Sequence, residues 1–177
     1  MQILIDHTGS DAFYTDAVNM MAQYRSLLKK PGRKVENMLQ TYKLLGIAAA
    51  VLLVIMAAMT IAWGSDTYMK VLMALLAVLL VFDIAYYSAL KKLKKRMMDD
   101  KRTSILTLDE NGVELNKEDE QVVRIAWDNL AFVRVYRECI GFVSKDVSGL
   151  IVFVERRYEG QVVPYVRETA PGVTIIS

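Results

Sequence analysis

Two long apolar runs constrain this chain more than any other feature of its sequence. The first, 44–63, contains no charged residue, and the second, 71–90, is interrupted only by Asp83. About 20 helical residues rise roughly 30 Å, which matches the hydrocarbon thickness of a bilayer. The link, 64–70, is too short to form a domain, so the sequence predicts an antiparallel transmembrane hairpin. A buried helix pair in a soluble bundle is disfavoured, because a chain of 177 residues leaves too few others to cover both helices.

Basic residues are concentrated on the sides of the two runs that face away from the link. Six lysines and arginines lie between residue 25 and the first run, and seven lie between the second run and residue 102. The link contains one lysine, Lys70, and one aspartate, Asp66. The positive-inside rule therefore places both termini in the cytosol and the link outside. We expect a multi-pass protein of the cell (cytoplasmic) membrane.

Residues 1–36 predict a cytosolic amphipathic helix that begins at Ser10–Asp11 and ends at Pro31–Gly32. Apolar side chains recur at three- and four-residue spacing on one face: Phe13, Ala17, Met20, Met21, Tyr24, Leu27 and Leu28. The last turn is basic, so this helix is suited to lie along the inner membrane surface. Packing against the C-terminal domain explains the same pattern equally well. His7, the single histidine, is expected to be a surface residue.

Residues 103–177 predict a small β-rich cytosolic domain. Strand-like segments occur at 105–108, 113–115, 121–126, 131–137, 140–143 and 150–154. Asn111–Gly112 predicts a tight turn between the first two. In the fourth segment, Val133 and Val135 alternate with Phe132, Arg134 and Tyr136. We expect six antiparallel strands in a curled meander, followed by a short helix over 158–169 that Pro164 weakens.

The fold class is therefore an α+β membrane protein with three consecutive parts. These are the amphipathic helix (1–36), a transmembrane hairpin with a basic extension (37–102) and the β-rich domain (103–177).

The order of these parts resembles the YcxB-like family of bacterial membrane proteins. The resemblance is carried by the two apolar spans, by Glu110-Asn111-Gly112-Val113 and by Ile125-Ala126-Trp127-Asp128-Asn129-Leu130. It implies a bacterial inner-membrane protein whose C-terminal domain has a pleckstrin-homology-like fold, a strongly bent antiparallel sheet. Members often carry a Pro-Lys-Arg-like motif after the last strand. The matching stretch here keeps a basic pair, Arg156–Arg157, and lacks the proline. The family is uncharacterised, so the resemblance implies architecture and not activity.

The basic residues beside the second run are candidate contacts for anionic lipid headgroups. A cluster directly inside the membrane attracts such headgroups by roughly 1 kcal/mol per basic residue. The alternative is that these charges only determine topology, which requires nothing beyond their presence. The candidate residues are Lys91, Lys92, Lys94, Lys95, Arg96, Arg156 and Arg157.

Asp83 is the one ionisable residue within a span, and a carboxylate there marks a functional site by default. It lies roughly 11 Å of helix from the basic flank at Lys91. It is therefore expected to reach the interface, to take a proton, or to pair with a polar group such as Thr60 in the other span.

Catalytic constellations are missing from the sequence. One histidine and one cysteine, Cys139, provide almost no material for nucleophilic catalysis, a disulfide or a metal cluster. We expect no enzyme activity, no cofactor and, at a net charge of +2, no nucleic-acid binding.

The sequence thus favours a membrane-anchored cytosolic binding or regulatory module of unidentified ligand. Its expected partners are the lipid bilayer, anionic headgroups, another protein and further copies of itself. The alternative is a subunit of a small oligomeric transporter or pore that uses Asp83.

Overall fold

The computed structural model describes residues 1–5, 9–64, 66–100, 104–117, 120–146 and 149–177. The chain divides into two compact units. The β unit combines Met1–Val35 with Lys94–Ser177, and the hairpin unit comprises Glu36–Leu93. Each unit is described by itself.

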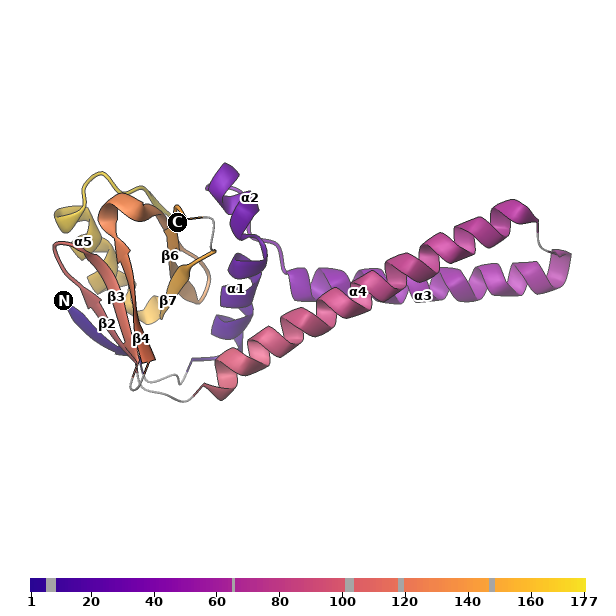
Figure 1. The fold of residues 1–177 in the computed structure, drawn as a ribbon, viewed down its shortest axis with the longest axis horizontal. Coiled ribbons are helices and arrows are strands. Elements are labelled where there is room, and N and C mark those ends of the chain that lie inside the picture. The colour runs from indigo at the N-terminus through magenta and orange to yellow at the C-terminus, as the bar shows by residue number, and fades with distance from the viewer. Residues whose placement is uncertain (6–8, 65, 101–103, 118–119, 147–148) are drawn as a thin grey trace. The chain divides into compact units, whose positions relative to one another are not determined.

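The β unit contains two four-stranded sheets (Figure 1). The first has the order β1-β2-β3-β4 and is antiparallel throughout; its strands are Gln2–Ile5, Ser104–Leu108, Gly112–Lys117 and Glu120–Ala126. The second has the order β7-β6-β5-β8, in which β8 pairs parallel to β5; its strands are Ile151–Glu155, Cys139–Ser144, Leu130–Val135 and Ile175–Ile176. A helix, α5 (Glu159–Thr169), follows β7 and continues through Pro164.

The main hydrophobic core joins both sheets and α5. It contains side chains from β2, β3 and β4, from β5, β6 and β7, and from α5, including Leu106, Val113, Ile125, Val133, Phe142, Val154, Val162 and Val166. All eight are almost completely buried. The predicted alternation in β5 is confirmed, because Val133 and Val135 belong to this core while Phe132 belongs to another.

The second core lies on the opposite face of the second sheet and is covered by the N-terminal helices. Helices α1 (Asp11–Ala22) and α2 (Tyr24–Lys29) form the predicted amphipathic segment, and the Ser10 side chain caps α1 by accepting the Phe13 N–H at 3.1 Å. Helix α1 packs against β6 and β7 (Figure 1). The buried apolar residues here include Phe13, Met20, Tyr24, Leu27, Phe132, Cys139, Val143 and Ile151. Of the two interpretations of this segment, packing on the C-terminal domain is the one observed.

Polar side chains fix this packing by bonding to main-chain groups. Asp16, which is buried, accepts the Glu138 N–H at 3.2 Å, and the Tyr24 hydroxyl donates to the carbonyl of Ser144 at 2.7 Å and to that of Asp146. Burial raises the pKa of the Asp16 carboxyl, although the bond from Glu138 opposes this shift.

The segment between α2 and the hairpin unit is held on β5 in the same way. The buried Arg134 guanidinium donates to the Pro31 carbonyl at 2.5 Å, and the Tyr136 hydroxyl donates to the Val35 carbonyl at 3.0 Å. Burial lowers the pKa of Arg134, as expected for a cation removed from water. Arg134 of β5 and Tyr136, the residue that follows β5, thus bind main-chain carbonyls of the segment that precedes the hairpin unit.

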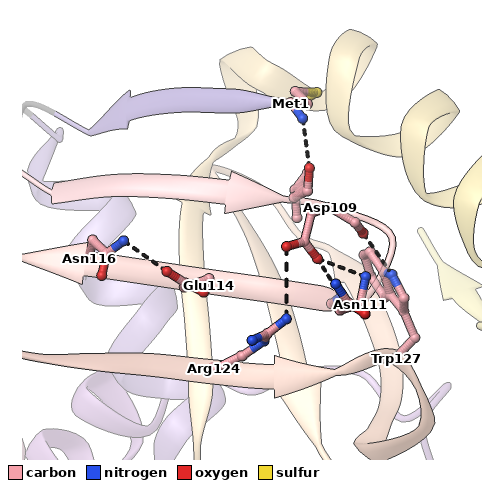
Figure 2. Close-up of polar contacts among 9 residues, drawn as sticks. Met1, Asp109, Asn111, Glu114, Asn116, Arg124 and Trp127 are labelled. Atoms are coloured by element: carbon pink, nitrogen blue, oxygen red, sulfur yellow. Dashed lines mark hydrogen bonds and ion pairs between the residues drawn. The ribbon is translucent and has the colours of Figure 1, made fainter.

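A hydrogen-bonded turn joins β2 to β3 at the predicted Asn-Gly position (Figure 2). Asp109 Oδ1 accepts the N–H groups of Asn111 at 2.7 Å and of Gly112 at 2.9 Å. The Trp127 indole N–H donates to the Asp109 carbonyl at 3.0 Å. A Cβ on Gly112 would lie 2.2 Å from the Ile125 carbonyl oxygen, so only glycine fits there. The two sequence segments that carry the family resemblance therefore meet at this turn.

The hairpin unit consists of two helices, α3 (Met38–Trp63) and, up to Leu93, the first part of α4 (Thr67–Asp99). Both are long and apolar enough to cross a membrane. Gly64 ends α3 with a positive φ of 84°, and Asp66 Oδ1 begins α4 by accepting the Met69 N–H at 2.7 Å. The link is therefore shorter than the predicted 64–70. From Met69 to Tyr87, the half-buried residues of α4 repeat with alternating spacings of four and three, as in a coiled-coil seam: Met69, Met73, Leu76, Leu80, Asp83 and Tyr87.

The observed division differs from the three consecutive parts predicted. Strand β1 pairs with β2 across about 100 residues of chain, with Gln2 opposite Thr107 and Ile5 opposite Ser104. Residues 1–35 consequently belong to the same unit as the C-terminal strands, and the hairpin is an insertion between them. The predicted meander of six antiparallel strands was also incomplete. It lacked β1 and β8, and β8 pairs parallel to β5.

Replacing Gly141 with valine should destabilise the β unit. A Cβ at this β6 position would lie 2.7 Å from Met20 Cε and 3.4 Å from both Ile151 and Phe153. Overpacking of this kind lowers the free energy of unfolding by about 1–3 kcal/mol. Gly160→Ala is the control, because nothing lies within 4 Å of its added Cβ. Thermal unfolding of the full chain in detergent measures the stability of both variants. A Gly141→Val variant as stable as the original protein would contradict this close packing of α1 against β6.

Replacing Asp109 with asparagine should produce a stability loss that depends on pH. The Asn111 and Gly112 N–H groups, with Arg124, hold the pKa of the Asp109 carboxyl below its ordinary value of 3.8. A lowered carboxyl pKa stabilises the fold above the unfolded value and loses that contribution as pH falls through the folded value. We expect Asp109→Asn to lower the melting temperature at pH 7 and the difference to shrink progressively below pH 3.8. Asp128→Asn, at an exposed neighbouring turn, removes the same charge without removing a hydrogen bond of the β2–β3 turn and is the matched control.

Candidate functional site

The predicted basic residues of α4 do not form one equivalent group. Lys91, Lys92, Lys95 and Arg96 are exposed. At 100° per residue they fall within an arc of about 140° on the helix. Lys94 falls outside this arc, and its ammonium contacts Asp11 Oδ1 at 2.6 Å. Only 18% of the Lys94 side chain is exposed. Lys94 therefore attaches the end of α4 to α1, and the other four remain the candidates for headgroup contact.

Arg156 and Arg157 follow β7 in a 3-10 turn, and each is paired with a carboxylate. Arg156 Nε lies 2.9 Å from Glu159 Oε2, and Arg157 Nε lies 2.7 Å from Glu155 Oε2. The Arg157 guanidinium also lies 5.0 Å from the centre of the Tyr158 ring. Both arginines are exposed, but these pairs reduce the positive charge that they offer to an anionic ligand.

Asp83 lies on the α3–α4 seam, opposite Gly46. A Cβ added to Gly46 would lie 3.9 Å from Asp83 Cβ, so the two residues are level with each other in the hairpin unit. Thr60, the predicted partner, is about 14 residues or roughly 21 Å of helix away from Gly46. Its hydroxyl donates to the Met56 carbonyl at 2.9 Å and lies 3.7 Å from Met73 Sδ. The pairing of Asp83 with Thr60 is therefore wrong, because the register of the two helices separates them.

An apolar cavity of about 200 Å³ lies within the β unit. Its walls come from α1, from the end of α4 and from β1, β3 and β7. The lining residues include Ile5, Phe13, Met21, Met97, Leu115, Ile151 and Phe153. Two acidic residues, Asp100 and Glu155, also line it. This volume exceeds the 150 Å³ or so of an apolar cavity that binds a benzene molecule.

Cys139 is completely buried in the second core, 3.7 Å from Met20 Sδ. Burial strongly raises the pKa of its thiol, so it remains protonated and unreactive at neutral pH. In the described ranges, no three residues among His, Cys, Asp and Glu gather closely enough to hold a metal ion. His7 lies outside the described residues.

Sequence reasoning missed the apolar cavity and the strand that helps to form it. Ile5 belongs to β1, a four-residue strand that gives almost no periodic signal by itself. Phe13 and Met21 were recognised as an apolar face, but the sequence left open whether the membrane or the C-terminal domain would cover that face. A stronger signal was available in the sequences of β5 and β6, neither of which has a polar face. Strands of this kind are expected to be covered on both sides, and nearly all of their residues are buried.

Comparison with known proteins gave no match to a family model, to a curated protein or to a solved structure. The resemblance to the YcxB-like family therefore stays a prediction from the sequence.

Proposed function

We propose that this chain is a membrane-anchored binding module in which the hairpin unit crosses the cytoplasmic membrane and the β unit binds a partner in the cytosol. The observation that carries the proposal is the apolar cavity of about 200 Å³ in the β unit. Apolar cavities of this size are favourable sites for an apolar ligand group, since filling them adds contacts that the empty walls lack. A branched aliphatic or aromatic group of a partner fits the volume.

The surface of the hairpin supports membrane anchoring. Large apolar side chains point outward along both helices, including Leu44, Val51, Val54, Ile61, Leu75, Val81 and Phe82. An exposed apolar surface of this extent is unfavourable in water and favourable against lipid tails. Both ends of the hairpin connect to the β unit, and the basic flanks favour the cytosol for that side.

The strand order supports a pleckstrin-homology-like fold for the β unit. Two sheets, antiparallel except for the pairing of β5 with β8, pack around one core, and a helix follows β7. In this interpretation β1 is the first strand of the fold, and the hairpin is inserted after it.

The alternative of a transporter or pore subunit depends on Asp83. Asp83 is level with Gly46, which is the third residue of the first apolar run. This position favours a role for Asp83 near the membrane interface over a role midway along a path through the membrane. The geometry therefore supports the binding module better.

Cysteine labelling should establish the topology. Cys139 is buried and its thiol pKa is raised, so it provides an unreactive background. Cysteines are introduced at Tyr68, which is 89% exposed beside the link, and at Lys30, which is exposed before the hairpin. In sealed right-side-out vesicles, a membrane-impermeant maleimide should label Tyr68→Cys and should label Lys30→Cys only after permeabilisation. Equal labelling of both before permeabilisation would contradict a membrane-spanning hairpin.

Photo-cross-linking should detect the partner at the cavity. A benzophenone side chain replaces Phe153 in the cavity wall, and the control position is Gln161, exposed on α5. We expect irradiation of native membranes to give a discrete adduct from position 153 and none from position 161. Met21→Trp, which fills the cavity from α1, should abolish that adduct. An adduct of equal yield at both positions, or one that persists with Met21→Trp, would contradict binding in the cavity.

A further inference from the structure

A second cavity, of about 300 Å³, lies in the hairpin unit beside the α3–α4 seam. Residues of α3 and α4 line it together, including Tyr42, Lys43, Gly46, Ala50, Asp83 and Tyr87. Gly46 and Ala50 create the space, because larger side chains there would occupy it. A Cβ on Gly46 would meet only Asp83 and Leu80, at 3.9 and 4.0 Å.

The surface that lines the cavity is almost entirely apolar, and residues that carry polar groups lie at one end of it, called here the polar end. Tyr42 and Lys43 precede the first apolar run, whereas Ala50 is seven residues into it. From Tyr42 to Ala50 the helix rises about 12 Å. On α4, Tyr87 and Asp83 line the polar part and Leu80 lines the apolar part. In a membrane, the polar end therefore lies at the headgroup level and the apolar end lies beside the acyl chains.

Lys43 and Asp83, which carry opposite charges, both line this end of the cavity. Lys43 is exposed and Asp83 is half-buried, and within the described part of the chain neither forms an ion pair. A carboxylate near lipid is unfavourable unless it is paired. A ligand that brings one anionic and one cationic group, a few bonds apart, satisfies both side chains together.

A phospholipid with a primary-amine headgroup has this arrangement of charges. Its phosphate is complementary to the Lys43 ammonium, and its own ammonium is complementary to Asp83 through a charge-assisted hydrogen bond. Purely anionic headgroups are repelled by Asp83, and a quaternary ammonium has no N–H to donate to a carboxylate. Aromatic rings favour a nearby cation, and Tyr42 and Tyr87 both line this cavity.

We propose that the α3–α4 cavity is a binding site for phosphatidylethanolamine, in which Lys43 holds the phosphate, Asp83 holds the ammonium and an acyl chain lies over Gly46 and Ala50. This inference rests on the proposed membrane anchoring. It is independent of the cavity in the β unit.

The number and kind of lipids that the purified protein retains test the proposed binding site. The full chain is purified from nanodiscs that contain equal amounts of phosphatidylethanolamine, phosphatidylglycerol and phosphatidylcholine, and retained lipids are counted by native mass spectrometry. We expect phosphatidylethanolamine to be retained at least fivefold over the other two. Asp83→Asn should remove this preference, and Lys43→Gln should reduce retention of all three lipids. Gly46→Leu, which fills the cavity, should reduce retention as well.

Matched controls lie at the other end of the hairpin. Asp66→Asn keeps a side-chain cap for α4 while removing a carboxylate, and Lys70→Gln removes an exposed ammonium. Neither should change retention. Equal retention of the three lipids by the original chain, or an unchanged preference in Asp83→Asn, would overturn the site. Alkaline extraction separates this failure from failure of the anchor: a chain that stays in vesicles without lipid preference contradicts the site alone, whereas a chain that is extracted contradicts both.

Discussion

The pairing of β1 with β2 is the constraint on which the rest of the structure depends. It brings Gln2–Ile5 against Ser104–Thr107, so the two ends of the hydrophobic hairpin must both connect to one β unit. The loop-closure entropy of such a pairing grows only with the logarithm of the chain length between the strands. The helices between them shorten the effective loop further, because an antiparallel hairpin returns the chain to where it left. A four-residue strand can therefore close a sheet across about 100 residues.

The N-terminal helices show how the same constraint decides a question that periodicity leaves open. An amphipathic helix with a basic end is equally suited to a membrane surface and to a protein core. Once β1 ties the chain to the first sheet, α1 and α2 follow it directly and cover the free face of the second sheet. Their apolar side chains, such as Met20 and Leu27, are then almost completely buried and not available to lipid. The main-chain bonds of Asp16 and Tyr24 fix which part of β6 they cover.

The sequence predicted features that depend on nearby residues and failed on features that depend on distant ones. Four local features were confirmed: the two apolar runs are helices, Ser10 caps α1, Asn111–Gly112 lies in a turn, and the residues of β5 alternate between two cores. Strands β1 and β8 are too short to give a periodic signal, and their partners are chosen by tertiary packing. The cavity of the β unit depends on how α1 and the end of α4 meet β7, which periodicity does not determine.

The register of the hairpin changes the physical meaning of Asp83, the one carboxylate within its two apolar runs. Counted along α4 alone, Asp83 belongs to an apolar run, where ionisation is most unfavourable near the bilayer centre. Opposite Gly46, it lies close to the start of the first run and shares a cavity with Lys43 and Tyr42. Its depth is thus set by α3 as much as by α4. A carboxylate close to the start of an apolar run, in a cavity that a lysine also lines, is compatible with a stable hairpin. It does not require the pathway through a membrane that its position in the sequence suggested.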